Sequence, residues 1–551
     1  MLLIRRFFYL NMILFAAYSA AAQRTYKANS VLAGGAWFRV SVTAAGIYKM
    51  DVPFLNSLGI TGSIHSAQIR VFGNGGGMIP EDYAPKRIDD LAENAIYVSD
   101  GGDGVLDGGD YVLFYAQGPD HWIADSTNKS FHHQKNLYSE KAYYYITVGG
   151  NGLRIPVQAI NPGSGVTVSS FDEHYFHELD TVNLLSSGKE WFGEEFSAMP
   201  GGMLTRSFSL PFADILPAPA SITTNVEARS VSVNSRFAVN IGGQSVQQIA
   251  VAPVGTSTYD LFAQQAQQTN QFIPVSNNPN ITLTYTQGSF NSQGWLNWFE
   301  VLCRRPLTIS GGGQLVFRDW ASTGSASASF QISGADATAQ VWDVSDPLHP
   351  VRMNASTAGG LMQFSNDAQK LHEYVAFTNS FLIPKVEGRI GNQNLHSSTE
   401  ADLIVVTYPG FLQQAQRLAQ FHQQNHHLRT VVVTTDQVYN EFGGGNPDPS
   451  AIRDFVKMYY DRYRSTWGNS GKYLLLFGKG SFDYRNKLIN TPVFVPPYES
   501  EVSVDPLATY TSDDFYGFLD DGENINSTLI NNQLDIGIGR IPAGTPEDAK
   551  N

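Results

Sequence analysis

The stretch from Ala401 to Asp483 constrains the fold most, because it alternates short apolar runs with helical patterns. The runs that are predicted to form buried strands are residues 403–406, 430–433 and 473–477. Residues 411–422 carry apolar side chains at helical spacing, and Ser450 is predicted to be the N-cap of a second helix. This order predicts a mainly parallel sheet covered by helices, whose chemistry lies in loops beyond the carboxyl ends of the strands. The loop expected to carry that chemistry is 478–483.

The whole chain predicts a multidomain protein that is rich in β-structure before this α/β domain. Its 551 residues are too many for one hydrophobic core. A hydrophobic content of 42% and a charged content of 16% are typical of globular proteins. We expect an N-terminal β-rich domain, a second, sandwich-like β-rich domain, a linker and the α/β domain. The predicted boundaries are 23–165, 166–345, 346–400 and 401–551.

Residues 1–22 are predicted to be a secretory signal peptide. Arg5 and Arg6 precede an apolar stretch that runs to Ala17, and small residues at 20–22 stand before Gln23. No later run reaches the roughly 18 apolar residues that a membrane-spanning helix needs. We therefore expect an exported protein that is soluble or peripherally attached to the cell surface.

The chain contains a single cysteine, Cys303, which excludes an intramolecular disulfide framework and a multi-cysteine zinc site. Cys303 lies in a predicted strand without the glycine-rich turn that would present a catalytic sulfur, so we expect a structural role for it. The net charge of −14 argues against nucleic acid as a partner.

A glycine-rich loop in the first domain carries four regularly spaced aspartates, which are Asp100, Asp103, Asp107 and Asp110. One interpretation is a calcium site, because hard cations bind several carboxylate oxygens on flexible backbone. The spacing is not that of an EF-hand, since Gly102 occupies the third position. The other interpretation is a plain Asp-Gly turn between strands. The sequence leaves both open.

The α/β domain contains a long acidic segment without a base. No Lys or Arg occurs between Lys487 and Arg540, whereas acidic residues stand at 499, 501, 505, 513, 514, 520, 521, 523 and 535. Such a segment repels itself unless it meets a cation. The two interpretations are a bound metal ion or basic substrate on the one hand and a solvated acidic loop on the other.

Several stretches together resemble the gingipain-type cysteine peptidases, and within them the cell-surface sortases of the type IX secretion system. The stretches are residues 37–42, 46–49, 72–76, 110–115, 187–194, 475–483, 512–517 and 535–542. The resemblance implies a caspase-like fold in which a histidine and a cysteine after the strand 535–542 form the catalytic dyad. No Gly-His-Gly occurs and Cys303 lies in another domain. We therefore expect an N-terminal fragment with an incomplete α/β domain and no catalytic residue.

The resemblance also implies a function, which is to cut C-terminal signal domains from exported cargo at the outer membrane surface. The expected partners are that cargo, other type IX secretion components and a surface glycolipid whose amine accepts the acyl group. No cofactor is required, and calcium is the one ion to consider. By the same resemblance, Ser512, Asp513 and Asp514 lie near the substrate pocket. The alternative function is a non-catalytic, exported β-rich scaffold or binding protein.

The signal peptide gives the first testable prediction. The exported protein should begin at Gln23, because the apolar stretch is too short to anchor the chain and small residues occupy the cleavage positions. Intact-mass analysis of the exported protein measures this directly. An N-terminus at Met1 would contradict the prediction.

Overall fold

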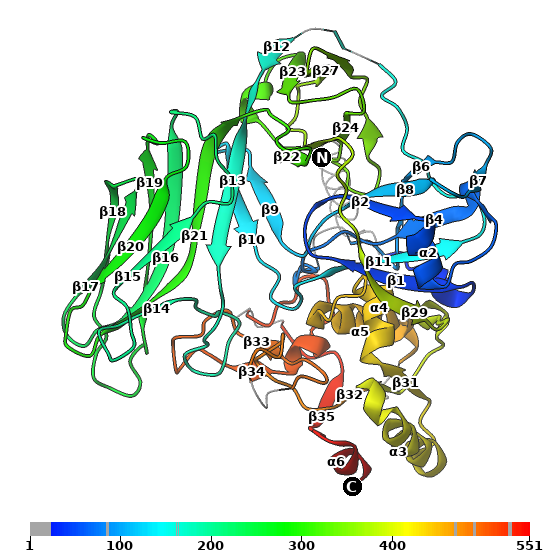
Figure 1. Ribbon diagram of the computed structural model, residues 1–551. Coiled ribbons are helices and arrows are strands. Elements are labelled where there is room, and N and C mark those ends of the chain that lie inside the picture. The colour runs from blue at the N-terminus through cyan, green and yellow to red at the C-terminus, as the bar shows by residue number, and fades with distance from the viewer. Residues whose placement is uncertain are drawn as a thin grey trace, which may run out of the picture.

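The computed structural model describes residues 24–83, 87–160, 162–163, 165–467, 471–488, 492–526 and 532–551. The predicted signal peptide at residues 1–22 therefore lies outside the described residues. Figure 1 shows β-rich units along the upper part of the molecule and an α/β unit at the lower, C-terminal end. In the part of the chain that is described, no helix has the length and apolar character needed to cross a bilayer.

The first β-rich unit packs two sheets face to face. Its strands are β1 (Trp37–Val42), β2 (Gly46–Asp51), β3 (Ile64–His65), β4 (Ile69–Phe72), β5 (Glu93–Asn94), β6 (Tyr97–Ser99), β7 (Val105–Leu106), β8 (Tyr111–Ala116), β9 (His121–Asp125), β10 (Ser130–Gln134), β11 (Ala142–Val148) and the much later β29 (Lys385–Ile390). The two sheets have the orders β29-β1-β11-β4-β5 and β2-β8-β6. Val40, Phe114 and Tyr144 are buried between them. The helix α2 (Val52–Leu58), capped by Asp51, adds to the same core.

The second unit is a β-sandwich, as predicted. Its strands are β13 (Ser170–Glu178), β14 (Glu195–Phe196), β15 (Thr205–Ser209), β16 (Ala220–Arg229), β17 (Ser235–Ile241), β18 (Gln244–Val251), β19 (Gln264–Phe272), β20 (Asn280–Thr286) and β21 (Gln293–Pro306). One sheet has the order β13-β21-β16-β19, with β14 beside β21, and the other has the order β15-β20-β17-β18. Val226, Phe237 and Leu296 fill the space between the sheets.

A third β-rich unit corrects two of the expected boundaries. Its strands are β12 (Val166–Val168), β22 (Gln314–Phe317), β23 (Ser327–Ser333), β24 (Gln340–Asp343), β25 (Val351–Arg352), β26 (Ser356–Ala358), β27 (Leu361–Asp367) and β28 (Tyr374–Phe377). They enclose a core of their own around Phe330 and Tyr374. The expected single domain 166–345 thus holds two cores, and the expected linker 346–400 supplies strands. In β27, buried Met362 and Phe364 alternate with more exposed residues, which is the period of a half-buried strand.

The α/β unit has the predicted parallel sheet. Its strands are β30 (Leu403–Thr407), β31 (Thr430–Thr434), β32 (Tyr473–Phe477) and β35 (Gly537–Ile541), in the order β31-β30-β32-β35, with a small hairpin of β33 (Tyr498–Glu499) and β34 (Thr511–Ser512). Its helices are α3 (Leu412–His426), α4 (Thr435–Phe442), α5 (Pro449–Tyr463) and α6 (Pro546–Lys550). Ile404 and Val406 face the core under α4 and α5, whereas Leu403 and Val405 face the core under α3. Both faces of the sheet are therefore covered.

Two helix starts differ from the prediction. The N-cap of α5 is Asp448, whose carboxylate accepts a hydrogen bond from the Ser450 amide at 2.8 Å, because Pro449 fits the first helical position. Helix α4 was not predicted. It begins at a capping box in which Gln437 and the N-cap Thr434 bond to each other's main chain.

Helix α5 joins the α/β unit to the first β-rich unit through buried polar groups. The guanidinium of Arg453 is almost fully buried, donates to the carbonyl of Glu81 and lies 4.3 Å from the ring of Tyr83. The carboxylate of Asp454 accepts a hydrogen bond from Arg87. Because unpaired buried charges are strongly unfavourable, these contacts fix the position of the sheet relative to the first unit.

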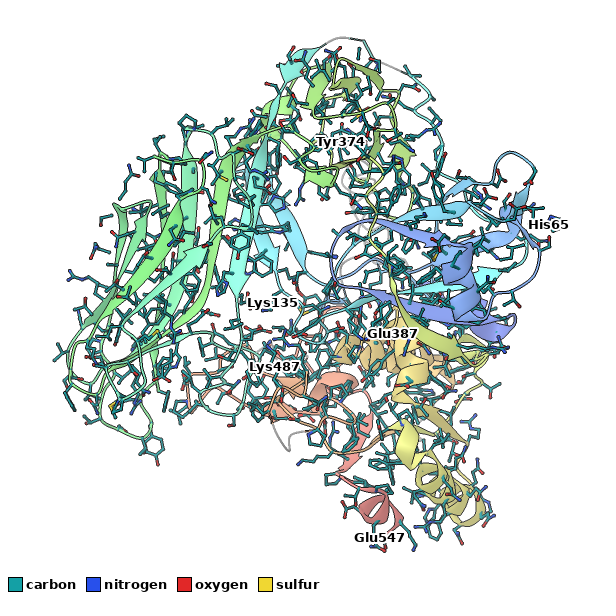
Figure 2. The ribbon with its side chains drawn as sticks, in the orientation of Figure 1. His65, Lys135, Tyr374, Glu387, Lys487 and Glu547 are labelled. Carbon is teal, nitrogen blue, oxygen red and sulfur yellow. The ribbon has the colours of Figure 1, made fainter. Side chains whose placement is uncertain are left out.

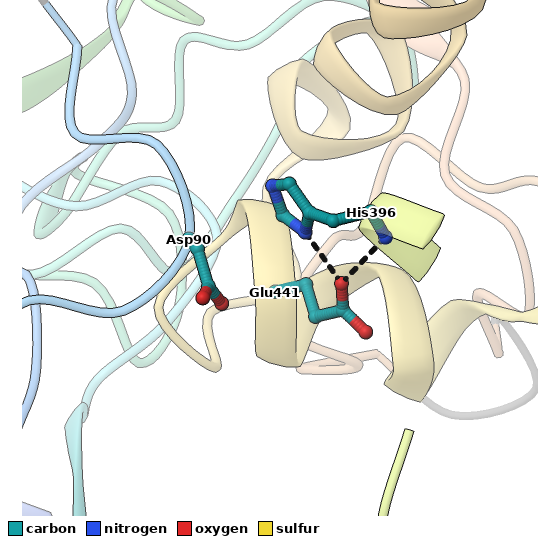
Figure 3. A group of neighbouring side chains, drawn as sticks. All are labelled: Asp90, His396 and Glu441. Carbon is teal, nitrogen blue, oxygen red and sulfur yellow. Dashed lines mark hydrogen bonds and ion pairs between the residues drawn. The ribbon is translucent and has the colours of Figure 1, made fainter. Parts of the chain in front are cut away.

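His396 forms a second link between the same two units (Figure 3). Its imidazole is fully buried, with Nδ1 2.6 Å from a carboxylate oxygen of Glu441 in α4 and Nε2 2.9 Å from one of Asp89 in the first unit. The ring also stacks on Phe442 at 4.7 Å. Burial alone would lower the pKa of His396, but the hydrogen bonds to the two carboxylates outweigh it and raise the pKa to about 9. The side chain is therefore charged at neutral pH.

This link predicts a pH-dependent stability. The folded pKa of His396 lies above its ordinary value of 6.5, so the stabilisation is complete below about pH 6.5 and is lost as the pH rises through about 9. Its upper value is about 3 kcal/mol. His396→Gln should therefore lower the thermal unfolding midpoint much more at about pH 6 than at about pH 9.5.

The matched control is His349→Gln, because His349 is exposed. It should change the midpoint little at either pH. A difference between wild type and His396→Gln that stays constant with pH would contradict the assignment of a charged imidazole.

Candidate functional site

The carboxyl ends of the parallel strands meet along one edge of the sheet, as such strands must. At this edge, the loop after β32 is bound to the chain after β35. The amide of Gly478 donates to the carbonyl of Ile541 and that of Lys479 to the carbonyl of Ala543, both at 2.9 Å. The predicted loop 478–483 therefore leaves the sheet where chemistry was expected.

Gly478 is required by close packing at the start of this loop. A Cβ atom there would lie 3.0 Å from Cβ of Phe494 and 3.0 Å from Cγ2 of Val495, at a φ of +153°. At the other end of the loop, the buried carboxylate of Asp483 accepts a hydrogen bond from the Leu488 amide at 2.7 Å. The loop is thus a fixed frame.

Arg540 organises the same edge. Its Nε and Nη2 donate to the two carboxylate oxygens of Asp513 at 2.7 and 2.6 Å. Its Nη1 donates to the carbonyls of Gly478 at 2.8 Å and Val495 at 2.7 Å. One planar guanidinium therefore joins β35, the loop after β32 and the segment around residue 513, in the fork geometry that arginine provides.

The three residues that the resemblance placed near a substrate pocket lie at this edge. Asp513 is bound to Arg540, so its carboxylate is already neutralised within the protein. Ser512 ends β34, and its hydroxyl accepts a hydrogen bond from the Asp514 amide at 3.1 Å. Asp514 is exposed. Their position agrees with a site beyond the carboxyl ends of the strands, and their contact with substrate stays a prediction.

Bases from other segments neutralise part of the acidic segment. The pairs are Lys189 with Glu501, Lys457 with Asp521, Arg464 with Asp520, and Arg540 with Asp513. The sequence interpretations considered an external cation or a solvated loop. For these four carboxylates, side chains of the protein itself provide the positive charge. A bound cation or basic substrate at the other acidic residues stays a prediction.

Sequence reasoning gave Arg540 no role in the site. It is the first base after Lys487, at the end of a segment that is otherwise acidic. That isolation was a usable signal, because a lone base beside many carboxylates is expected to pair with one of them.

The aspartates of the first unit do not converge on a common point. The carboxylates of Asp100 and Asp103 accept hydrogen bonds from the amides two residues onward, at 3.1 and 2.9 Å, and Asp110 accepts one from the Asp107 amide at 2.9 Å. This pattern is that of an Asp-Gly turn. A calcium ion at this loop stays a prediction.

Among the described residues, one group has the side chains that could hold a metal ion. It consists of Asp90, His396 and Glu441, whose ligand atoms lie within 4.8 Å of one another (Figure 3). Both ring nitrogens of His396 face carboxylates, so the imidazole holds a proton on each and has no lone pair for a metal. Asp90 accepts hydrogen bonds from Ser30 and the amide of Val31. The group is therefore a structural link and a poor metal site.

Cys303 lies in β21 inside the sandwich core and is 4% exposed. Burial, with a smaller contribution from the charge of Glu173, raises the pKa of its thiol to about 12. A thiol in this setting is neutral and inaccessible. The predicted structural role of Cys303 agrees with this environment.

Because Asp513 forms a bidentate pair with Arg540, we expect Asp513 to contribute more than Asp514 to the order of the carboxyl edge of the sheet. Asp513→Asn removes the charge partner of a half-buried guanidinium and should destabilise the carboxyl edge by about 1–3 kcal/mol. Asp514→Asn, at an exposed position, should change the free energy of unfolding by less than about 0.5 kcal/mol. Hydrogen exchange of residues 478–483 measures the effect, and equal exchange in both variants would contradict it.

Comparison with known proteins agrees with this geometry. Residues 396–551 match peptidase family C25. No curated protein sequence matches the chain. The crystal structure of dimeric latent PorU from Porphyromonas gingivalis is similar at a TM-score of 0.80 and 24% identity, over 95% of this chain and 49% of that one. This chain thus spans about half the length of that PorU chain.

Two carbohydrate-binding modules are similar over small parts of the chain only. The CBM36-1 domain of a xylanase from the hindgut metagenome of Trinervitermes trinervoides has a TM-score of 0.15 at 14% identity, over 23% of this chain and 96% of its own. A CBM36 module in complex with calcium and xylotriose has a TM-score of 0.14 at 14% identity, over 22% and 97%. These scores indicate no shared overall fold. Residues 396–551 thus match peptidase family C25, within a chain whose fold is similar to that of PorU.

Proposed function

We propose that this chain is part of a gingipain-type cysteine endopeptidase. The observation that carries the proposal is the match of residues 396–551 to peptidase family C25, in a unit whose parallel sheet has an ordered carboxyl edge. In parallel α/β folds, that edge is where reacting groups and substrates are held.

The nucleophile of this proposal lies outside residues 1–551. The only cysteine among them is Cys303, which is buried in the sandwich core, whereas a catalytic thiol must be ionised and accessible. A cysteine thiolate would attack the peptide carbonyl, a histidine would move the proton, and main-chain amides would stabilise the oxyanion.

The residues described here contribute the frame of that site. Arg540 and Asp513 hold the loop after β32 against β35. Exposed Lys479 and Asp514 lie on the segments that this pair joins, and there they are open to a peptide substrate. A frame of this kind positions reacting groups, and errors of about 1 Å in such positions are costly to the rate.

In the cell, we propose, the enzyme is a type IX secretion sortase. It would be exported, attached peripherally to the outer membrane surface, and remove the C-terminal signal domains of cargo proteins together with other secretion components. The acyl-enzyme would pass to an amine of a surface glycolipid, without a cofactor. The PorU-like fold over nearly the whole chain supports this role.

A thiol-reactive, active-site-directed probe tests the proposal on the protein that the whole gene encodes, including any residues after 551. The probe should label that protein, and a peptide spanning a cargo signal-domain junction should be cleaved. Cys303→Ser should retain both, because its thiol is buried and neutral.

Two outcomes would overturn the proposal. Labelling that disappears in Cys303→Ser would place the nucleophile in the sandwich. A protein that is neither labelled nor able to cleave, but still binds cargo, would support the non-catalytic scaffold.

A further inference from the structure

A cavity of about 700 Å³ lies where the first β-rich unit, the sandwich and the α/β unit meet. We call it the junction cavity. Its walls are the hairpin strand β10 of the first unit, the outer face of the sandwich sheet β13-β21-β16-β19, and residues 501–504 of the α/β unit. Figure 2 shows Lys135 and Lys487, from the first and the α/β unit, on the facing segments at this junction.

The strand period explains why polar groups line the junction cavity. In β16, Ile222, Val226 and Ala228 point into the sandwich core, so the alternate residues Asn225 and Glu227 point to the outer face. Such a face is normally solvated. Here Trp295 of the same face packs with Val504 of the α/β unit, and the outer face is covered.

Most charged groups around the junction cavity have partners. His133 lies 2.7 Å from Glu178 and 2.6 Å from Glu300. Lys189 is nearly buried and pairs with Glu501 at 2.7 Å and with Glu81.

Asp180 is a further paired group at the junction. The carboxylate of Asp180 lies 3.3 Å from the ammonium group of Lys135 in the first unit. It also pairs with Arg485 and Lys487 of the α/β unit. Most charged groups at the boundary between these three units are thus paired.

Two carboxyl groups are exceptions. Glu190 accepts hydrogen bonds from the amides of Asn297 at 2.8 Å and Gln265 at 3.0 Å, and no described cation pairs with it. Glu227 is 0% exposed, and neither of its carboxylate oxygens has a hydrogen-bond partner among the described residues. Burial, together with the charge of Glu190, raises the pKa of Glu227 to about 9. Burial likewise raises the pKa of Glu190 to about 7.

A fully buried carboxyl group without a partner is unfavourable by about 1–3 kcal/mol or more, and native proteins contain few of them. A mainly structural role would be served better by a neutral or apolar residue. Glu190 and Glu227 both line the junction cavity, so a cation bound there can satisfy both.

We propose that the junction cavity binds ligands through a primary ammonium group, which Glu227 and Glu190 hold between them. A bare metal ion fits less well. Among the described residues, the three side chains whose ligand atoms lie close together are those around His396, and they are not in the junction cavity. The volume of the junction cavity, about 700 Å³, suits a ligand larger than a metal ion. The ring of Trp298 and the amides of Gln267 and Asn297 line the space beside the two carboxyl groups. A lysine side chain and an amino sugar share the required chemistry.

Binding should release a proton. Glu227 is protonated in the empty cavity at neutral pH and must ionise to pair with an ammonium group. The affinity for a lysine ligand should therefore increase as the pH rises from about 6 toward about 9, while the lysine itself stays charged. This inference does not depend on the proposed peptidase activity.

The test is calorimetric titration of the intact protein with Nα-acetyl-lysine amide, compared with Nα-acetyl-norleucine amide, which lacks the charge. The lysine compound should bind and the norleucine compound should not. Glu227→Gln should weaken binding by about tenfold or more, because a charged hydrogen bond is lost. Its thermal unfolding midpoint should stay the same or rise, which separates lost binding from misfolding.

The matched control is Glu195→Gln, since Glu195 is exposed on the same sandwich. It should bind like wild type. An amino sugar is the second source of an ammonium group, so the same titrations use glucosamine and, as the compound without the amine, glucose. Binding of glucosamine but not of glucose would also support the proposal. Equal binding of lysine and norleucine compounds, unchanged binding in Glu227→Gln, or binding of calcium chloride but of neither amine would overturn it.

Discussion

The pairing of buried charge at the contacts between domains is the constraint on which the rest of the structure depends. Helix α5 is covered on its polar side as well as its apolar side. Its Arg453 is bound by Glu81 and its Asp454 by Arg87, both of the first unit. His396 is held in the same way between two carboxylates. Because an unmatched charge at such depth is strongly unfavourable, the domains are held in one relative position more precisely than apolar contacts alone would hold them.

The same constraint shapes the candidate site. Lysines and arginines pair with several carboxylates of the acidic segment before Arg540, which lowers the unfavourable free energy of packing that segment beside the sheet. Arg540 then has two functions at once, since it neutralises Asp513 and binds the carbonyl of Gly478. The loops beyond the sheet are therefore ordered by electrostatics and by close packing at Gly478, and a peptidase site built on them has a rigid base.

The junction cavity is informative because it departs from this pattern. Around it, Lys189 and Asp180 are paired across domain boundaries, yet Glu227 is buried without a partner. Native proteins contain few buried carboxyl groups without any hydrogen-bond partner, so Glu227 is a functional signal. Glu227 lies in the sandwich, far along the chain from residues 396–551, so ligand binding and peptide cleavage can be separate properties of the protein.

The sequence by itself determined the local elements of the α/β unit, because strand and helix periods are properties of neighbouring residues. The strands at 403, 430 and 473 and the sandwich were predicted for that reason. Helix α4, the third β-rich unit and the strands within 346–400 were missed, since short segments become regular only when distant partners such as β1 pair with them. The carboxylate partners of His396, and the lack of a hydrogen-bond partner for Glu227 among the described residues, were decided by the tertiary structure alone. The pairing of His396 with Asp89, which lies far away in the sequence, depends on how the domains pack, and no local pattern in the chain records it.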